Sequence, residues 1–141
     1  MNPTDLEKLL LEQIPITQSM QIKILQADLV NVELACPLEP NHNHVGMAFG
    51  GSLSNIMILA AYCRLFIMIG GYGHVLLKNS SMEFLKPVKE DLRAVSPRPD
   101  EISSYEFLKT YQKKNRAKII LTSEVRLLDG SIAARMTGEF V

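Results

Sequence analysis

Two neighbouring groups of residues near the middle of the chain have types and spacing suited to chemistry. Residues 41–44 (Asn-His-Asn-His) are a polar segment, and residues 49–52 (Phe-Gly-Gly-Ser) open a long apolar stretch. Histidine is the side chain best suited to take a proton near neutral pH. If the apolar stretch is a helix, its first free N–H groups favour negative charge, and the glycines let a ligand approach the backbone closely.

Both groups also have a plain structural interpretation. Asn and His are common in exposed turns, and Gly50-Gly51 could merely allow a tight turn before the helix. Within the polar segment His44 is the better candidate base, because His42 alternates away from it. A metal site at His42 and His44 would need a third ligand. The remaining histidine, His74, is distant in sequence, beyond the far end of the apolar stretch. We therefore expect no metal.

The apolar stretch must be wrapped by other parts of the protein. From residue 53 to residue 69 nearly every side chain is apolar, and the clearly polar exceptions are Ser54, Asn55 and Arg64. Such a helix has no face suited to water. It is shorter than the roughly 20 residues that a bilayer needs, and Arg64 lies well inside it. We expect a buried helix held by a sheet, in which Arg64 has a structural partner, rather than a membrane span.

The other segments show the periodicities of strands and short helices. Helices are expected at 4–14 and 103–113, and strands at 20–27, 29–36, 75–88, 91–96, 117–128 and 132–140. Thr4 with Glu7, and Ser103 with Glu106, have the spacing of capping boxes for the two short helices. An Asp-Gly pair before the last strand is a hairpin signal. Strands that run in pairs predict a mostly antiparallel sheet and the α+β class.

Composition narrows the function classes. The 141 residues form one expected domain, 47% of them are apolar, and 15 basic residues balance 15 acidic ones. No basic surface is expected for nucleic acid, and no basic amphipathic helix for a membrane. A net charge of zero favours self-association. Cys36 and Cys63 lack a CxxC spacing, and no signal peptide is evident, so we expect reduced thiols and a cytoplasmic location.

This order of elements, with residues 49–52 opening the central helix, resembles the hotdog fold. It is most similar to the thioesterase domain family found at the C-terminus of YiiD-type acetyltransferases. The markers are the Asn-rich loop 41–44, the Phe-Gly-Gly-Ser turn, residues 84–87 (Phe-Leu-Lys-Pro), and the short helix before the last two strands. The resemblance covers about Leu6 to Val141.

The resemblance implies a curved antiparallel sheet of about six strands wrapped around a long central apolar helix. It also implies a homodimer with two active sites at its interface, and it leaves open whether two dimers associate. The expected substrates are acyl groups held as thioesters of coenzyme A or of an acyl carrier protein, with no separate cofactor.

The resemblance further suggests roles for individual residues. A backbone N–H of Gly51 or Ser52 would bind the developing oxyanion of the thioester carbonyl. Asn41 or Asn43 matches the family position that holds the nucleophilic water or the carbonyl, and His44 is the candidate base beside it.

The chain lacks the acidic residue that the family pattern places on the central helix. Many hotdog thioesterases carry Asp or Glu one to two turns past the Gly-Gly, where this chain has Asn55, Ile58 and Leu59. Asn55 could orient a water but cannot take its proton. Glu83 would be the missing base if it faces the pocket, and an ordinary surface charge if it faces solvent. The remaining expected substrate contacts are Phe49, Gly50, Asn79 and Ser81.

Three functions remain in competition at this point. An acyl thioesterase is the first, and a non-catalytic acyl-binding or dimerisation module that has lost the acid is the second. A dehydratase or isomerase is the third, and it is disfavoured because such enzymes of this fold carry a helix acid. For the first, we expect a medium to long acyl chain to run along Leu53 and Met57.

Overall fold

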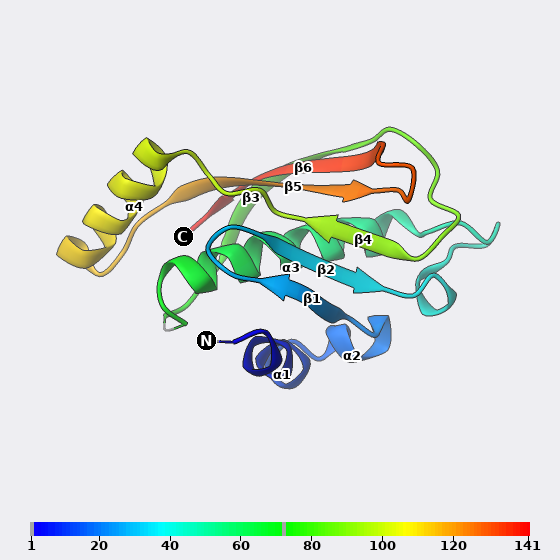
Figure 1. Cartoon of the computed structure of the whole chain (residues 1–141), viewed down its shortest axis with the longest axis horizontal. Helices are drawn as coiled ribbons and strands as arrows, with labels where there is room; N and C mark the ends of the chain where they lie inside the picture. Colours follow the sequence, from blue (N-terminus) through cyan, green and yellow to red (C-terminus); the bar gives the residue numbers. More distant parts are fainter. Residues whose placement is uncertain (1, 72) are drawn as a thin grey trace.

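The computed structural model describes residues 2–71 and 73–141, and in this part of the chain six strands form one sheet against a long helix (Figure 1). The helices are α1 (Pro3–Gln13), α2 (Ile16–Met20), the 3-10 turn η1 (Glu39–Asn41), α3 (Gly50–Met68) and α4 (Glu101–Lys114). The strands are β1 (Lys23–Ala27), β2 (Val32–Cys36), β3 (Leu77–Phe84), β4 (Leu92–Val95), β5 (Ile119–Arg126) and β6 (Ile132–Phe140).

The sheet has the order β1-β2-β4-β5-β6-β3, and each pair of neighbours is antiparallel. The predicted hotdog architecture, a curved antiparallel sheet around a central helix, is confirmed. One pairing implied by the sequence is wrong, because β3 and β4 follow each other in the chain but do not pair. The connection around Pro87 carries the chain from the far edge of the sheet to a place between β2 and β5. Strand β3 is left as an edge strand.

The central helix α3 is enclosed by the concave face of the sheet. By length and composition it could cross a membrane, yet more than half of its most apolar window is buried inside the domain. Alternate residues of β2, β4, β5 and β6 face it, which explains their near-complete burial. The core residues buried to 1% exposure or less include Leu34, Ile56, Met57, Ala60, Leu92, Leu121, Val125 and Phe140.

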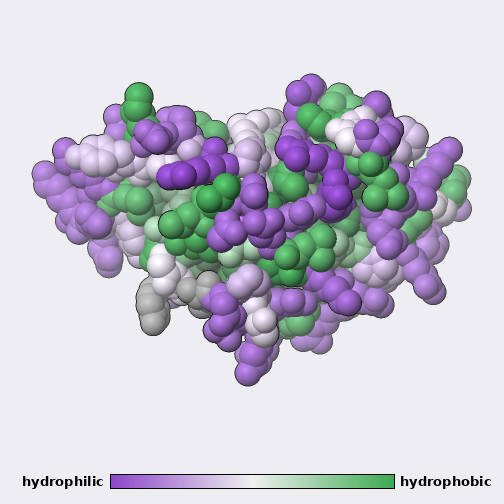
Figure 2. All heavy atoms as spheres, in the orientation of Figure 1, coloured by the Kyte–Doolittle hydropathy of each residue, from purple (hydrophilic) through white to green (hydrophobic). Residues whose placement is uncertain are grey.

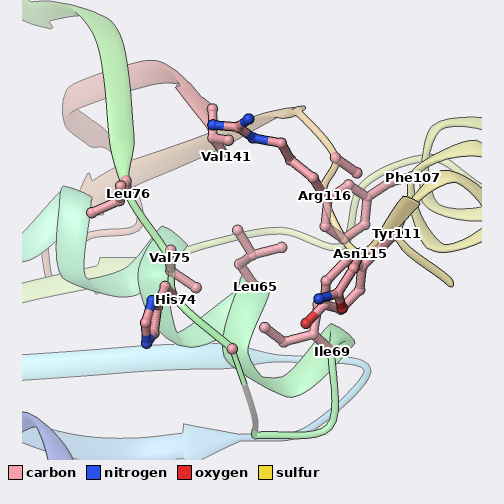
Figure 3. A pocket seen from close by; sticks show the side chains of 12 residues that line it. Leu65, Ile69, His74, Val75, Leu76, Phe107, Tyr111, Asn115, Arg116 and Val141 are labelled. Atoms are coloured by element: carbon pink, nitrogen blue, oxygen red, sulfur yellow. The ribbon is translucent and has the colours of Figure 1, made fainter. Parts of the chain in front are cut away.

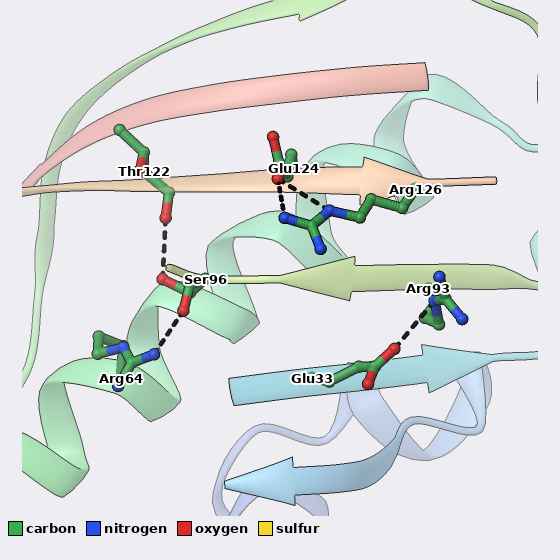
Figure 4. A network of polar contacts seen from close by, with 7 residues as sticks. All are labelled: Glu33, Arg64, Arg93, Ser96, Thr122, Glu124 and Arg126. Atoms are coloured by element: carbon green, nitrogen blue, oxygen red, sulfur yellow. Dashed lines mark hydrogen bonds and ion pairs between the residues drawn. The ribbon is translucent and has the colours of Figure 1, made fainter. Parts of the chain in front are cut away.

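The convex face of the sheet carries ion pairs instead of a second apolar layer (Figure 2). Hydrophilic side chains run across this face in Figure 2, with smaller hydrophobic areas between them. Cross-strand or same-strand pairs join Glu33 to Arg93, Glu124 to Arg126, Glu83 to Arg135 and Lys78 to Glu139. Figure 4 shows the first two of these pairs. Opposite charges on facing strands support the register of a sheet with one wet face.

The helix starts differ from the predicted capping boxes. Asn2 caps α1 by accepting the N–H of Asp5 at 2.9 Å, so the helix already begins at Pro3. Asp100 caps α4 by accepting the N–H of Ser103 at 2.8 Å. In both cases the short side chain stands three residues before the N–H that it accepts, the usual geometry of an N-cap.

Helix α2 was not expected from the sequence. The hydroxyl of Thr17 donates to the main-chain oxygens of Leu10 at 3.0 Å and Ile14 at 2.7 Å, which folds this segment back onto α1. Gln21 ends the helix in the left-handed conformation, with φ 58°. The first strand therefore starts at Lys23 and not at residue 20.

Candidate active site

The amino end of α3 presents three unbonded N–H groups. The first hydrogen bond of the helix runs from the N–H of Leu53 to the oxygen of Phe49 at 3.0 Å. Phe49 is the N-cap residue and its side chain makes no capping hydrogen bond. Within the described residues the N–H groups of Gly50, Gly51 and Ser52 therefore have no acceptor. Three such donors at the positive end of a 19-residue helix are suited to a carbonyl that gains negative charge.

Gly51 leaves room for the ring of Phe49. A Cβ atom placed on Gly51 would lie 2.4 Å from Cε2 and 2.9 Å from Cδ2 of that ring. A Cβ atom on Gly50 would meet no atom within 4 Å. Only the second glycine is therefore restricted by packing within the chain. The ring itself is 55% exposed and lies beside the free N–H groups, as the sequence order requires.

Asn41 holds the loop that precedes α3. Its side chain is buried, and Nδ2 donates to the oxygens of Met20 at 2.9 Å and Pro37 at 2.8 Å. Its main-chain oxygen accepts the N–H of Phe49 at 2.8 Å. The side chain thus faces α2 and fixes the point where α3 begins. Its Oδ1 is buried and has no partner in the described residues.

Asn43 closes the turn of the same loop. Its Oδ1 accepts the N–H groups of Val45 at 3.0 Å and Met47 at 3.1 Å, and its own N–H donates to the oxygen of Met47 at 2.6 Å. This is the turn geometry typical of asparagine. Nδ2 of Asn41 and Oδ1 of Asn43 therefore hold the loop together, which agrees with the plain structural interpretation of both residues. Nδ2 of Asn43 donates no hydrogen bond in the described residues.

The two histidines of the loop are both exposed but differ in their contacts. Nδ1 of His42 lies 2.7 Å from the oxygen of Asn43, and His42 forms an isolated antiparallel bridge with Ala48. His44 makes no side-chain hydrogen bond in the described residues. The ring of His44 is therefore the freer of the two to contact a ligand.

Asn55 and Ser52 lie on the first two turns of α3 and are half-buried. Nδ2 of Asn55 lies 3.8 Å from the sulfur of Met20, the residue whose oxygen binds Asn41. Both amides therefore gather around Met20 and support the loop. The hydroxyl of Ser52 has no hydrogen-bond partner in the described residues, so both its N–H and its hydroxyl are available.

The predicted site residues of β3 lie on the convex face of the sheet. Asn79, Ser81 and Glu83 stand opposite residues 139, 137 and 135 of β6. Glu83 forms an ion pair with Arg135 at 3.2 Å. The structure therefore does not bring these three side chains to the concave face that holds α3. Of the two alternatives for Glu83, the candidate base and the surface charge, the geometry fits the surface charge, because strand alternation puts Met82 and Phe84 on the concave face instead.

Strand β3 nevertheless leads to the site at its end. The N–H of Ala48 donates to the oxygen of Val88 at 2.8 Å, which joins the loop before α3 to the segment after β3. Large apolar side chains are exposed along these two segments. They are Val45, Phe49, Phe84 and Leu85, each between 46% and 58% exposed. The amino end of α3 therefore opens onto an apolar surface and is not sealed.

Five cavities of the described residues lie away from this site. Of five cavities between about 180 and 480 Å³, none is lined by a residue from 41 to 55. The path of an acyl chain along Leu53 and Met57 stays a prediction, and both side chains are packed in the core. The cavity of about 480 Å³ lies at the other end of α3 (Figure 3). No periodic pattern of residues indicates this cavity, since its walls come from four separate segments.

Other chemistries find little support in the geometry. Burial raises the pKa of the thiols of Cys36 and Cys63 to about 12, which makes both poor nucleophiles. No group of three His, Cys, Asp or Glu side chains within residues 2–71 and 73–141 is arranged to hold a metal ion.

Fold and site together define a hotdog domain whose central helix offers free N–H groups at an open apolar surface. The chain belongs to the family described as "Putative thioesterase (yiiD_Cterm)", whose model matches residues 3–141. This confirms the resemblance seen in the sequence. A search of curated proteins finds no match.

Solved structures support the same fold. A protein of unknown function from Chlorobaculum tepidum superposes with a TM-score of 0.90 at 24% identity, covering 98% of this chain and 91% of that one. A "putative thioesterase" from Shewanella oneidensis gives 0.85 at 23%, covering 98% and 94%. A "probable thioesterase" from Pseudomonas aeruginosa gives 0.80 at 20%, covering 98% and 93%. At these identities the likeness concerns the fold.

Proposed function

We propose that this protein is an acyl thioesterase that hydrolyses thioesters of coenzyme A or of an acyl carrier protein. The observation that carries the proposal is the set of three unbonded N–H groups at Gly50, Gly51 and Ser52. A thioester carbonyl bound there would be polarised, and the tetrahedral oxyanion that follows would be stabilised by the same donors. The exposed apolar side chains around these N–H groups suit the acyl portion of such a substrate.

The hydrolytic water and its base are proposed to lie on the loop side of the carbonyl. His44 is exposed and makes no side-chain hydrogen bond in the described residues, which leaves its ring free to bind a ligand. In the proposed reaction His44 takes a proton from water as the water oxygen attacks the carbonyl carbon. The carbon–sulfur bond then breaks, and the proton goes to the leaving thiolate. The products are a carboxylic acid and a free thiol.

We further propose a homodimer formed through β3. This strand has eight residues, contains no proline and pairs on one side only, with β6. A long free edge of this kind is normally covered in native proteins. Pairing with the same strand of a second copy would satisfy its free N–H and C=O groups and cover the exposed apolar residues at its end.

A non-catalytic acyl-binding module is the second candidate. The specific observation in its favour is the lack of a carboxylate on the first turns of α3, where Asn55 faces Met20. Such a module would bind the same ligands through the same N–H groups. It would leave the thioester intact, because no strong base would stand at the carbonyl.

The two candidates are separated by measuring thiol release from acyl-coenzyme A esters with acyl chains of increasing length. The thioesterase proposal expects turnover that falls about 100-fold or more in His44→Gln and stays near the wild-type rate in His42→Gln. Both histidines are exposed, so both variants should keep the fold, which circular dichroism would verify. Saturable binding with no thiol release would instead establish the binding module.

A further inference from the structure

A cavity of about 430 Å³ on the convex face of the sheet has an excess of positive charge. Its walls come from the β1–β2 turn and the start of β2, from β4 and the segment that follows it, and from the end of β5. Of the described residues that line it, three are arginines and one is acidic. The arginines are Arg93, Arg98 and Arg126, and the acidic residue is Glu33.

The register of β4 and β5 brings two of these arginines side by side. Val95 of β4 pairs with Glu124 of β5. Arg93 and Arg126 each stand two residues away from that pair, in the same direction along the sheet, so both project from its convex face. Figure 4 shows their side chains with the nearby acidic ones. Like charges on facing positions of two strands repel unless anions lie beside them.

The acidic neighbours leave several N–H groups of these arginines without an acceptor. Arg126 donates to one oxygen of Glu124 through Nε, at 2.9 Å, and through Nη2, while its Nη1 donates no hydrogen bond within the described residues. Nε of Arg93 lies 2.9 Å from Oε1 of Glu33, but in a geometry that makes no hydrogen bond, and this nitrogen is buried. Since each guanidinium carries five N–H donors, both arginines can bind a further anion.

Arg98 is the third arginine, and it is exposed. Its side chain makes no ion pair and no hydrogen bond with residues 2–71 and 73–141. The rings of Pro97 and Pro99 restrict the backbone on both sides of it. Just before them, the N–H of Ser96 donates to the oxygen of Val32 at 3.0 Å, which ties this segment to β2. The backbone that carries Arg98 is therefore held at the cavity without a ligand, so less ordering is needed on binding.

The buried guanidinium of Arg64 adds a reason for an anion at this place. It donates to the main-chain oxygens of Ser96 and Val30, two residues that line the cavity. Burial lowers the pKa of Arg64, the carboxylate of Asp28 raises it, and the positive charge of Arg98 lowers it further. An anion bound beside Arg98 would offset the repulsion between these two arginines.

We infer that this cavity binds a phosphate monoester, whose phosphate is held by Arg98 and by the free donors of Arg93 and Arg126. Planar guanidinium groups bind phosphate through paired N–H···O contacts, and a phosphate monoester carries a charge of about −1.5 to −2 at neutral pH. The cavity has room for an organic group beside the phosphate, and Val95 and Pro97 offer that group apolar contacts.

This cavity is separate from the candidate active site. Its lining residues belong to the ranges 26–33, 93–98 and 126, whereas the candidate active site consists of residues 41–55. The cavity also lies on the convex face of the sheet, and α3 lies on the concave face. The inference therefore goes beyond the proposed function and does not rest on it.

Calorimetry with small phosphate compounds tests the ligand class. The probes are glycerol 3-phosphate, ribose 5-phosphate and adenosine 5′-monophosphate, compared with inorganic phosphate and with uncharged adenosine. At least one monoester should bind saturably, with one molecule per chain and a lower Kd than inorganic phosphate, and adenosine should not bind. Equal or tighter binding of inorganic phosphate would overturn the assignment of an organic ligand, and so would the absence of saturable binding by every monoester.

Charge variants test the position of the site. Arg98→Gln removes an exposed side chain that has no contacts to lose, and it should raise the Kd of the tightest monoester about tenfold or more. Arg98→Lys keeps the charge without the planar fork and should give an intermediate Kd. Arg135→Gln is the matched control, because Arg135 lies on the same convex face, pairs with Glu83 and does not line the cavity. Its Kd should stay within about twofold of wild type.

The same variants give a second readout through stability. A ligand that binds only the folded chain raises Tm, so the monoester should raise the Tm of the wild type and of Arg135→Gln, but not that of Arg98→Gln. An unchanged Kd in Arg98→Gln would overturn the inference, as would an equal loss in Arg135→Gln, which would indicate general attraction to a basic surface. Both readouts are independent of thiol release, so a failure of the proposed function leaves this test valid.

Discussion

The guanidinium of Arg64, on the buried helix α3, donates a 2.7 Å hydrogen bond to the main-chain oxygen of Ser96 at the end of β4 (Figure 4). The hydroxyl of Ser96 in turn donates to the oxygen of Thr122 on β5 at 2.8 Å. The same guanidinium reaches the oxygens of residues 28–30 in the β1–β2 turn at 3.1–3.2 Å. One buried cation therefore ties the helix to two separate parts of the sheet through backbone carbonyls.

Replacement of Arg64 by methionine should strongly destabilise the fold. Methionine has a similar length but no donors, so four carbonyl oxygens lose their partner at a site where Arg64 is 1% exposed. We expect the free energy of unfolding to fall by about 3–5 kcal/mol, measured by urea denaturation. Arg64→Lys keeps the charge with fewer donors and should fall between methionine and wild type. A loss below about 1 kcal/mol in Arg64→Met would show that the carbonyls find other partners.

The cap of α4 should make the stability of that helix depend on pH. Hydrogen bonds from the N–H and hydroxyl of Ser103 hold the pKa of Asp100 below its ordinary value of 3.8. A carboxyl whose pKa is lowered by folding stabilises the protein above its unfolded pKa, and this contribution is lost as the pH falls through the folded pKa. Asp100→Ala should therefore lower Tm at pH 7, and the difference from wild type should shrink below pH 3.8.

Asp100→Asn is the control for that prediction. Asparagine keeps the capping oxygen without the charge, so the Tm of this variant should depend less on pH than that of the wild type. Thermal unfolding followed by circular dichroism between pH 7 and pH 2.5 measures all three proteins. A constant difference between Asp100→Ala and wild type across this range would contradict an ionised cap.

The sequence predicted those parts of the fold that depend on local periodicity. The apolar helix and the alternating β6 strand were placed almost to the residue, because burial on all sides or on one face leaves a direct trace in residue type. The position of β3 at the far edge left no such trace. Pairing partners depend on how the chain crosses the sheet, and the exposed, mixed composition of β3 does not specify them.

The candidate site was predictable only in part for a related reason. The glycine pair and the helix start are local features, and the structure brings them together with the loop that carries His44. The role of Asn41 depends on Met20 and Pro37, whose main-chain oxygens it binds, and no side-chain pattern records such contacts. The alternation of residues along β3 correctly placed Glu83 and Phe84 on opposite faces of the sheet. It could not show which of the two faces contacts α3.

The contact between Phe49 and Gly51 leads to a prediction with a matched control. Gly51→Ala puts a methyl group where the exposed ring now lies, so the ring must shift over the free N–H groups. We expect kcat/KM for thioester hydrolysis to fall about tenfold or more, because those donors would be less accessible. Gly50→Ala meets no atom within 4 Å and should stay within about twofold of wild type.

A double variant separates the ring from the backbone in this experiment. In Gly51→Ala combined with Phe49→Ala the methyl group no longer displaces a ring, so the activity should match that of Phe49→Ala alone. Equal losses of kcat/KM in Gly50→Ala and Gly51→Ala would instead indicate that activity depends on the flexibility of the backbone and not on the position of the Phe49 ring. Urea denaturation of each variant would show that stability changes by no more than about 1 kcal/mol.

The free edge of β3 gives the last prediction. Ser81→Arg would place two like charges near each other at the axis of a β3-paired dimer, which opposes association. Sedimentation equilibrium should then change from a dimer to a single chain of 15.8 kDa. Thr137→Arg makes the same change on β6 directly opposite Ser81, one strand away from the edge, and should leave the dimer intact. Thiol release should fall only in the first variant, because pairing through β3 covers the exposed apolar residues beside the proposed site. A Ser81→Arg protein that stays dimeric would mean that the chains associate through another surface.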